Sequence, residues 1–307
     1  PAVLEAAAKA LGSSHYRARA GTTTWLNGVY WVRVLERLPD GNLLIENLYD
    51  VGKIVVRQVQ VSVEPDLVYP LLRGRDIAMW RAAPSDCILV AQDPATRKGY
   101  EESEMRVSWP LTYAYLRRFE KELRQRSGFR KYFEATDPFY SMYNVGPQTS
   151  APLKVVWREL ATGMAAAVCA PVASHALGER PCVPDHTVIA VSVQTACEGH
   201  YLCALLNSSP SRWIAQSYLH LHASPHVLNH VKIPRFDGAD RRHLRLAELS
   251  AEAHVATAGD EATITSIQAE VDEVAAELWD IGGAEIRLLR DALGYSGGKA
   301  QEPEERE

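Results

Sequence analysis

The periodicity of the apolar residues changes at Phe236-Asp237-Gly238, and this change restricts the fold more than any other feature of the sequence. Before it, short runs of β-branched and aromatic residues alternate with turn residues, a pattern typical of antiparallel sheets. After it, apolar residues recur every three or four positions, as on one face of a helix. The sequence therefore predicts an α+β fold, in which a mostly antiparallel β-sheet domain with interspersed helices (residues 1–236) precedes a C-terminal helical hairpin (within residues 237–293). Residues 294–307 are Gly-rich and then acidic, and predict a disordered tail.

Two runs near the start of the chain predict a β-hairpin. Val29 to Leu35 is rich in β-branched and aromatic residues, and the turn residues 39–42 lead from it to Leu43 to Leu48. Ile54 to Val63 alternates apolar and polar residues, so a half-buried strand is predicted there. Further strands are predicted at Cys87–Ala91, Lys154–Leu160, Met164–Ala170 and Thr187–Val193.

Two stretches predict helices. Apolar residues at intervals of four follow the start signal Trp109-Pro110 and predict one helix, with Leu111, Tyr115, Phe119 and Leu123 on one face and Arg117, Lys121 and Arg124 on another. Near the C-terminus, apolar residues from Ile264 to Ile281 follow a spacing of three and four, and Gly282-Gly283 ends the pattern. This apolar seam needs a partner helix, which we predict at Arg241 to Ala253. A short third helix is predicted at Ile286 to Leu293.

The two parts of the chain carry opposite net charge. Residues 1–236 hold 26 basic and 21 acidic side chains, whereas residues 237–307 hold 7 and 17. The formal net charge of −5 excludes a uniformly basic nucleic-acid binder and permits a locally basic one. Residues 106–135 form the most basic stretch, with eight Lys or Arg against three acids. Two interpretations of this stretch stay open: a solvated surface helix, or a set of phosphate contacts.

Cysteine usage and apolar runs indicate the compartment. Five cysteines, an odd number without a Cys-x-x-Cys pair, favour a reducing environment and predict a cytoplasmic protein. The longest apolar run, Met164 to Val172, has about half the length that a membrane span needs.

Several enzyme classes lack their local motifs in this sequence. None of the eight lysines has an acid two residues before it, as a restriction-type nuclease core requires. The chain has no Pro-Pro, so the Asn-Pro-Pro-Tyr type of base pocket used by amino-methylating DNA methyltransferases is absent. Metal ligands of the right type occur within 22 residues, but their irregular spacing favours buried thiols and ordinary histidines over a structural zinc: Cys182, His186, Cys197, His200 and Cys203.

An ordered set of segments resembles the target recognition domain that follows the catalytic domain in adenine-specific DNA methyltransferases of the type IIG restriction-modification and Taq-like class. The sharpest segment is Val68-Tyr69-Pro70-Leu71-Leu72-Arg73-Gly74-Arg75-Asp76-Ile77, followed by Trp80. The others, in order, are residues 16–30, 109–126, 151–159, 201–208, 231–236 and 271–279. Together they span roughly residues 16–290.

The resemblance implies a module that selects a short site on double-stranded DNA and positions it for a methyltransferase domain. It implies no cofactor in this chain and S-adenosylmethionine in a catalytic domain, which belongs to the same polypeptide or to a separate subunit. Phosphate contacts are predicted at Arg117, Arg118, Lys121, Arg124 and Arg126, and base or backbone contacts at Arg73, Arg75, Thr24, Asn27, His222 and Ser224. For Arg73 and Arg75, pairing with Asp76 is the structural alternative.

Two other functions remain open. A protein-interaction scaffold would dock another subunit through the 264–281 seam and would use the basic stretch only as surface. An enzyme with a site around the Cys/His cluster would require bound metal.

Overall fold

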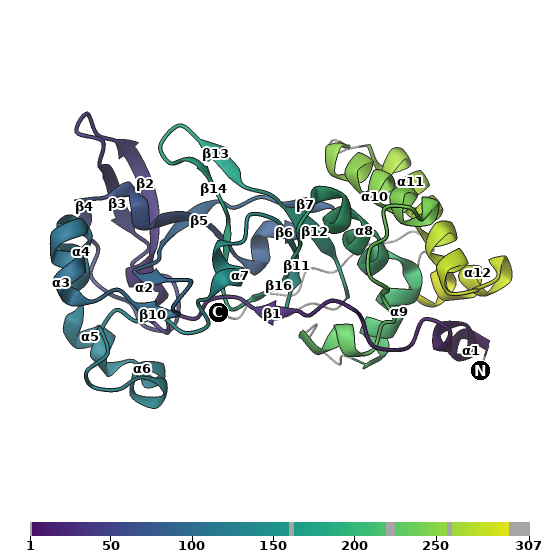
Figure 1. Cartoon of the computed structure of the whole chain (residues 1–307), viewed down its shortest axis with the longest axis horizontal. Helices are drawn as coiled ribbons and strands as arrows, with labels where there is room; N and C mark the ends of the chain where they lie inside the picture. The colour runs from purple at the N-terminus through teal and green to yellow at the C-terminus, as the bar shows by residue number, and fades with distance from the viewer. Residues whose placement is uncertain (1, 160–162, 219–224, 257–259, 295–307) are drawn as a thin grey trace.

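The computed structural model describes residues 2–159, 163–218, 225–256 and 260–294, so the predicted tail lies outside the described residues except for Gly294. The molecule is elongated, with helices at both ends and the sheets between them (Figure 1). The α+β class and the mostly antiparallel strand pairing are confirmed.

The larger sheet has six strands in the order β15-β5-β8-β2-β3-β4, and only the β15–β5 pair in it is parallel. The predicted hairpin is confirmed as β2 and β3, and the prediction at Cys87 as β8. The strands are β2 (Trp31–Arg37), β3 (Leu43–Asn47), β4 (Gln60–Val63), β5 (Val68–Leu72), β8 (Asp86–Leu89) and β15 (Val183–Pro184).

The strand predicted from Ile54 to Val63 is wrong in its first half, because β4 begins only at Gln60. The buried side chain of Asn47 explains this. Its Oδ1 accepts from Val59 N at 2.7 Å, and its Nδ2 donates to Gly28 O at 2.8 Å and Arg57 O at 3.0 Å. A side-chain amide thus supplies bonds that a strand ladder would have made, and Val55 is left 69% exposed.

The second sheet has four antiparallel strands in the order β1-β16-β11-β12. These are β1 (Arg19–Ala20), β11 (Lys154–Arg158), β12 (Ala166–Cys169) and β16 (Val188–Ser192), and the last three confirm the predicted strands with shorter bounds. Three small antiparallel pairs complete the described strands: β6 (Ile77–Ala78) with β7 (Arg81–Ala82), β9 (Gln92–Asp93) with β10 (Lys98–Gly99), and β13 (Val172–Ser174) with β14 (Gly178–Arg180).

The helices gather at the two ends of the molecule (Figure 1). One end carries α3 (Glu102–Ser108), α4 (Pro110–Arg117), α5 (Glu120–Gln125) and α6 (Ser127–Tyr132). The other carries α1 (Ala2–Ala8), α8 (Ala196–Asn207), α9 (Ser209–Tyr218), α10 (Arg241–Val255), α11 (Glu261–Leu278) and α12 (Gly283–Ala292). Shorter elements between them are α2 (Asn27–Tyr30), α7 (Pro147–Ser150), η1 (Pro65–Leu67), η2 (Gly74–Asp76) and η3 (Pro225–Asn229).

The predicted C-terminal helices are confirmed: α10 packs against α11, and α12 follows. The seam on α11 is buried inside the chain, since Ile267, Val271 and Ala275 are at most 6% exposed. α10 also packs against α8, which precedes residue 236.

Two main apolar cores result. One lies under the six-stranded sheet and α3–α5, and the other joins α1, the four-stranded sheet and α8–α12. The second core continues across residue 236, and the domain division there stays a prediction.

The contact between α8 and α10 contains two neutral histidines. Val168 N donates to His254 Nε2 at 2.9 Å, and His254 Nδ1 lies 2.6 Å from Ser250 O, which places the proton on Nδ1. The His200 ring lies 4.9 Å from the His254 ring. Burial, and then the neighbouring His254, lower the pKa of His200 to about 4, and burial also lowers the pKa of His254.

We expect stability to fall on acidification because of this pair. The unfolded chain takes up protons near pH 6.5 and the folded chain only nearer pH 4, so the stabilisation is complete above about pH 6.5 and is lost as the pH falls toward 4. For the partly exposed His200, the loss is about 1 to 2 kcal/mol. Urea unfolding at stepped pH values checks this: H200Q is expected to flatten the profile and H15Q, at an exposed histidine, to leave it unchanged. Identical profiles for H200Q and the parent protein would refute the assignment.

Candidate nucleic-acid interface

The basic stretch lies at the end of the molecule formed by α3 to α6 (Figure 1). The single helix predicted from Leu111 to Leu123 is wrong, because the chain leaves helical geometry at Phe119 and forms α4 and α5. The apolar side chains at Tyr115, Phe119 and Leu123 are buried as predicted, whereas Leu111 is 38% exposed.

Two side chains near β4 contact the two ends of α4, and the contact of Arg57 lies at the interruption. The Glu64 carboxylate accepts from Leu111 N and Thr112 N at 2.8 Å each, which caps the start of α4. At the other end, Arg57 Nη2 donates to Arg118 O at 2.6 Å, and the Arg57 guanidinium lies 5.1 Å from the centre of the Phe119 ring. These tertiary contacts fix the ends of α4 and turn the chain into α5.

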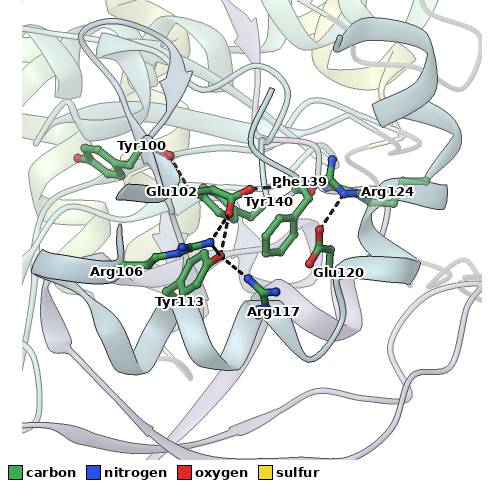
Figure 2. A network of polar contacts seen from close by, with 10 residues as sticks. Tyr100, Glu102, Arg106, Tyr113, Arg117, Glu120, Arg124, Phe139 and Tyr140 are labelled. Carbon is green, nitrogen blue, oxygen red and sulfur yellow. Dashed lines mark hydrogen bonds and ion pairs between the residues drawn. The ribbon is translucent and has the colours of Figure 1, made fainter. Parts of the chain in front are cut away.

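A polar network occupies the surface between α3, α4 and α5 (Figure 2). Tyr113 stands at its centre: its hydroxyl donates to Glu102 Oε2 at 2.7 Å and accepts from Arg106 and Arg117 at 3.0 Å each. Arg124 bonds to Glu120 Oε1 at 3.0 Å and lies 3.9 Å from Glu102 Oε1. The charge of Arg124 is thus shared between two carboxylates, which weakens it as a phosphate clamp.

Between Glu102 and Tyr132, five exposed cations form no ion pair with the residues that the structure describes: Arg117, Arg118, Lys121, Arg130 and Lys131. Three of them are predicted site residues. Arg130 and Lys131 on α6 were missed as candidates, although the charge count over residues 106–135 includes them, because the predicted helix ended before them. We call these five residues the cation group.

Arg126 was predicted to contact phosphate, but it is buried and its hydrogen bonds lie within the fold. It is 2% exposed, and its guanidinium donates to four backbone carbonyls: Thr24 O and Phe139 O at 2.7 Å, Leu123 O at 2.8 Å and Ser141 O at 3.0 Å. Burial lowers its pKa, and arginine still keeps its charge at neutral pH. Four of its five N–H groups thus bond to carbonyls of the fold.

The predicted contacts in the first loop are also used within the fold. Thr24 is 1% exposed, and its hydroxyl donates to Asn27 Oδ1 at 2.5 Å. Thr24 therefore cannot reach a base in this conformation, and Asn27, which is half-buried, holds the turn into α2.

Arg73 and Arg75 lie in the segment between β5 and β6, and these two strands lie apart from α4 to α6, which carry the cation group (Figure 1). Arg73 is 6% exposed and stacks over the Trp31 ring at 4.5 Å, so it supports the sheet. Arg75 is exposed and pairs with Asp86 at 2.9 Å, and its Nε lies 3.9 Å from Asp76. Asp76 itself accepts from Arg73 N at 2.9 Å, in line with the structural alternative.

The remaining predicted contacts, His222 and Ser224, lie outside the described residues. Among residues that the structure describes, no three His, Cys, Asp or Glu side chains are placed to hold a metal ion. No helix in the described ranges is both long and apolar enough to cross a membrane.

Solved structures, and neither family models nor curated proteins, give matches to this chain. No protein family matches the sequence, and no curated protein does. Among solved structures, the chain is similar to the type IIL restriction-modification enzyme MmeI, determined in complex with DNA, with a TM-score of 0.50 at 10% identity. The similarity covers 91% of this chain and 35% of the MmeI chain. It shows a shared fold that extends through most of this chain and corresponds to about a third of a longer enzyme.

Proposed function

We propose that this chain is the DNA-recognition part of a restriction-modification enzyme, and that it positions double-stranded DNA for an adenine-specific methyltransferase domain. The observation that carries the proposal is the fold shared with MmeI over 91% of the chain. The cation group supports it, because phosphate contacts require exposed Lys and Arg side chains whose charge is not taken up by an ion pair.

In this proposal, methyl transfer is carried out by another domain and not by this chain. The methyltransferase domain, in the same polypeptide or in a separate subunit, would bind S-adenosylmethionine and the target adenine, and this chain would supply site selection. Such an enzyme works on DNA in the cytoplasm.

The scaffold alternative loses its main support. Its docking surface was the 264–281 seam, and the seam residues Ile267 and Val271 are buried against other helices of this chain.

The test is fluorescence anisotropy with random-sequence duplex DNA at roughly 20 to 300 mM salt. We expect affinity to fall steeply as salt rises, with a slope that corresponds to several phosphate contacts. A folded protein that fails to bind at the lowest salt would refute the proposed function.

The cation group is tested by a matched pair of double variants. R118A/K121A is expected to reduce the salt slope by about two and to weaken binding about tenfold or more at low salt. R241A/R287A removes two exposed arginines from α10 and α12 at the other end of the molecule and is expected to bind like the parent protein. Equal losses in both double variants would mean that net charge alone governs binding.

A further inference from the structure

Three aromatic rings from separate segments pack against one another beside the cation group. Trp25 lies in the loop before α2, Tyr132 ends α6, and Tyr143 follows in a later loop. The Trp25 and Tyr132 rings are 5.6 Å apart at an interplanar angle of 13°, and the Tyr132 and Tyr143 rings are 4.8 Å apart at 29°. We call these three residues the aromatic platform.

Two rings of the platform are exposed, although aromatic side chains are usually buried. Tyr132 is 48% exposed and Tyr143 44%. Trp25 adopts a φ of 55°, a left-handed conformation that is costly for a bulky residue. Its indole lies against Gly128, where a Cβ atom would fall 2.0 Å from the ring, so only glycine permits this approach. The fold therefore accepts a strained backbone at Trp25 to place its ring against the two exposed tyrosines.

Buried bonds fix the segments that carry the rings. Arg126 donates to Thr24 O and to Ser141 O, and so joins the Trp25 loop to the Tyr143 loop. Thr23 and Tyr143 exchange two backbone hydrogen bonds of 3.0 Å. Asn144 Nδ2 adds bonds to Ala20 O at 2.6 Å and Gly21 O at 3.1 Å. The loops that carry Trp25 and Tyr143 are thus fixed to each other without a ligand.

The charges beside the rings select the kind of ligand. Lys131 Nζ already lies 4.9 Å from the centre of the Tyr132 ring, and Arg130 is exposed one residue away. These cations repel a cationic ligand and attract an anionic one. A flat aromatic ligand that carries negative charge matches both features, and a nucleotide with its base and phosphate is such a ligand.

We propose that the aromatic platform binds an unpaired base of DNA by stacking on Tyr132 and Tyr143, while Arg130 and Lys131 contact the adjoining phosphates. The inference rests on the proposed function, since it assigns a second kind of contact to the same DNA. It means that the chain holds a base that has left the duplex, in addition to the paired DNA that the rest of the cation group contacts.

The experiment compares two duplexes that differ in one nucleotide. One is fully paired, and the other carries a single unpaired 2-aminopurine, whose fluorescence is quenched when it stacks. The parent protein is expected to bind the second duplex about tenfold more tightly and to quench it. Y132A/Y143A is expected to lose the preference and the quenching, and Y132F/Y143F, which keeps both rings, to retain them. Thermal unfolding of each variant verifies that it is folded.

Three outcomes would overturn the inference: equal affinity of the parent protein for both duplexes, an unchanged preference in Y132A/Y143A, or displacement of the unpaired duplex by free deoxyadenosine monophosphate at matched concentration. The last would assign the platform to a free nucleotide. Binding of the paired duplex is a separate readout. If the protein does not bind the paired duplex but still prefers the unpaired base through Tyr132 and Tyr143, the proposed function is refuted and the proposed role of the aromatic platform is supported.

Discussion

Arg126→Ala is expected to lower the free energy of unfolding by about 3 to 5 kcal/mol. The substitution leaves four backbone carbonyls, including those of Thr24, Phe139 and Ser141, without their buried donor. No water reaches them easily, because the side chain that they surround is 2% exposed. Arg126→Lys keeps the charge but supplies one donor atom in place of three, so we expect it to recover only part of the loss.

Urea unfolding measures both variants. Arg118→Ala is the matched control, since it removes an exposed guanidinium eight residues away, and its effect is expected to stay within about 0.5 kcal/mol. If Arg126→Ala lowers the free energy of unfolding by less than about 1 kcal/mol, the four hydrogen bonds of the guanidinium do not stabilise this end of the molecule as proposed.

Asp272→Ala is expected to cost about 3 to 5 kcal/mol at the other end of the molecule. Asp272 on α11 is 1% exposed and accepts from Arg290 Nε at 2.7 Å, Ser209 N at 2.6 Å and Ser209 Oγ at 2.7 Å. One carboxylate thus joins α9, α11 and α12. Its removal leaves Arg290, whose side chain is 23% exposed, without a counter-charge.

The control is Glu273→Ala, which removes an exposed acid next along the same helix and is expected to change stability by less than about 0.5 kcal/mol. Hydrogen exchange gives a second readout, because loss of the Arg290 tether is expected to reduce protection in α12 before the rest of the core. Uniform protection in Asp272→Ala would contradict this role of the carboxylate.

Elements with a strong period were predictable from the sequence. The 3–4 spacing of α11 and the turn between β2 and β3 are local properties, and both elements form where expected. The failures have tertiary causes. The Asn47 side chain replaces part of a strand ladder, and Glu64 and Arg57 bind the two ends of α4. The periodicity of apolar residues does not reveal such contacts between distant segments.

The sequence predicted where the basic residues of the candidate site lie along the chain, but not which of them are buried and which face solvent. The count over residues 106–135 located the basic end of the molecule, yet it treated Arg126 as equivalent to Arg118. One is enclosed by carbonyls from segments up to 102 residues away, and the other faces solvent. The aromatic platform had no signal in the sequence because its rings come from three distant segments.

The path of the N-terminal segment has a consequence for folding. Residues 2–30 run along the molecule from α1 beside α12 to α2 at the opposite core (Figure 1). Phe236 N donates to Tyr16 Oη across 220 residues of sequence, and Lys9 pairs with Glu285 across 276. Contacts of such sequence separation carry a high loop-closure entropy and form slowly. On a ribosome, residues 2–30 are therefore made before the segments around Phe236 and Glu285, and can reach their native place only once those later segments have been made.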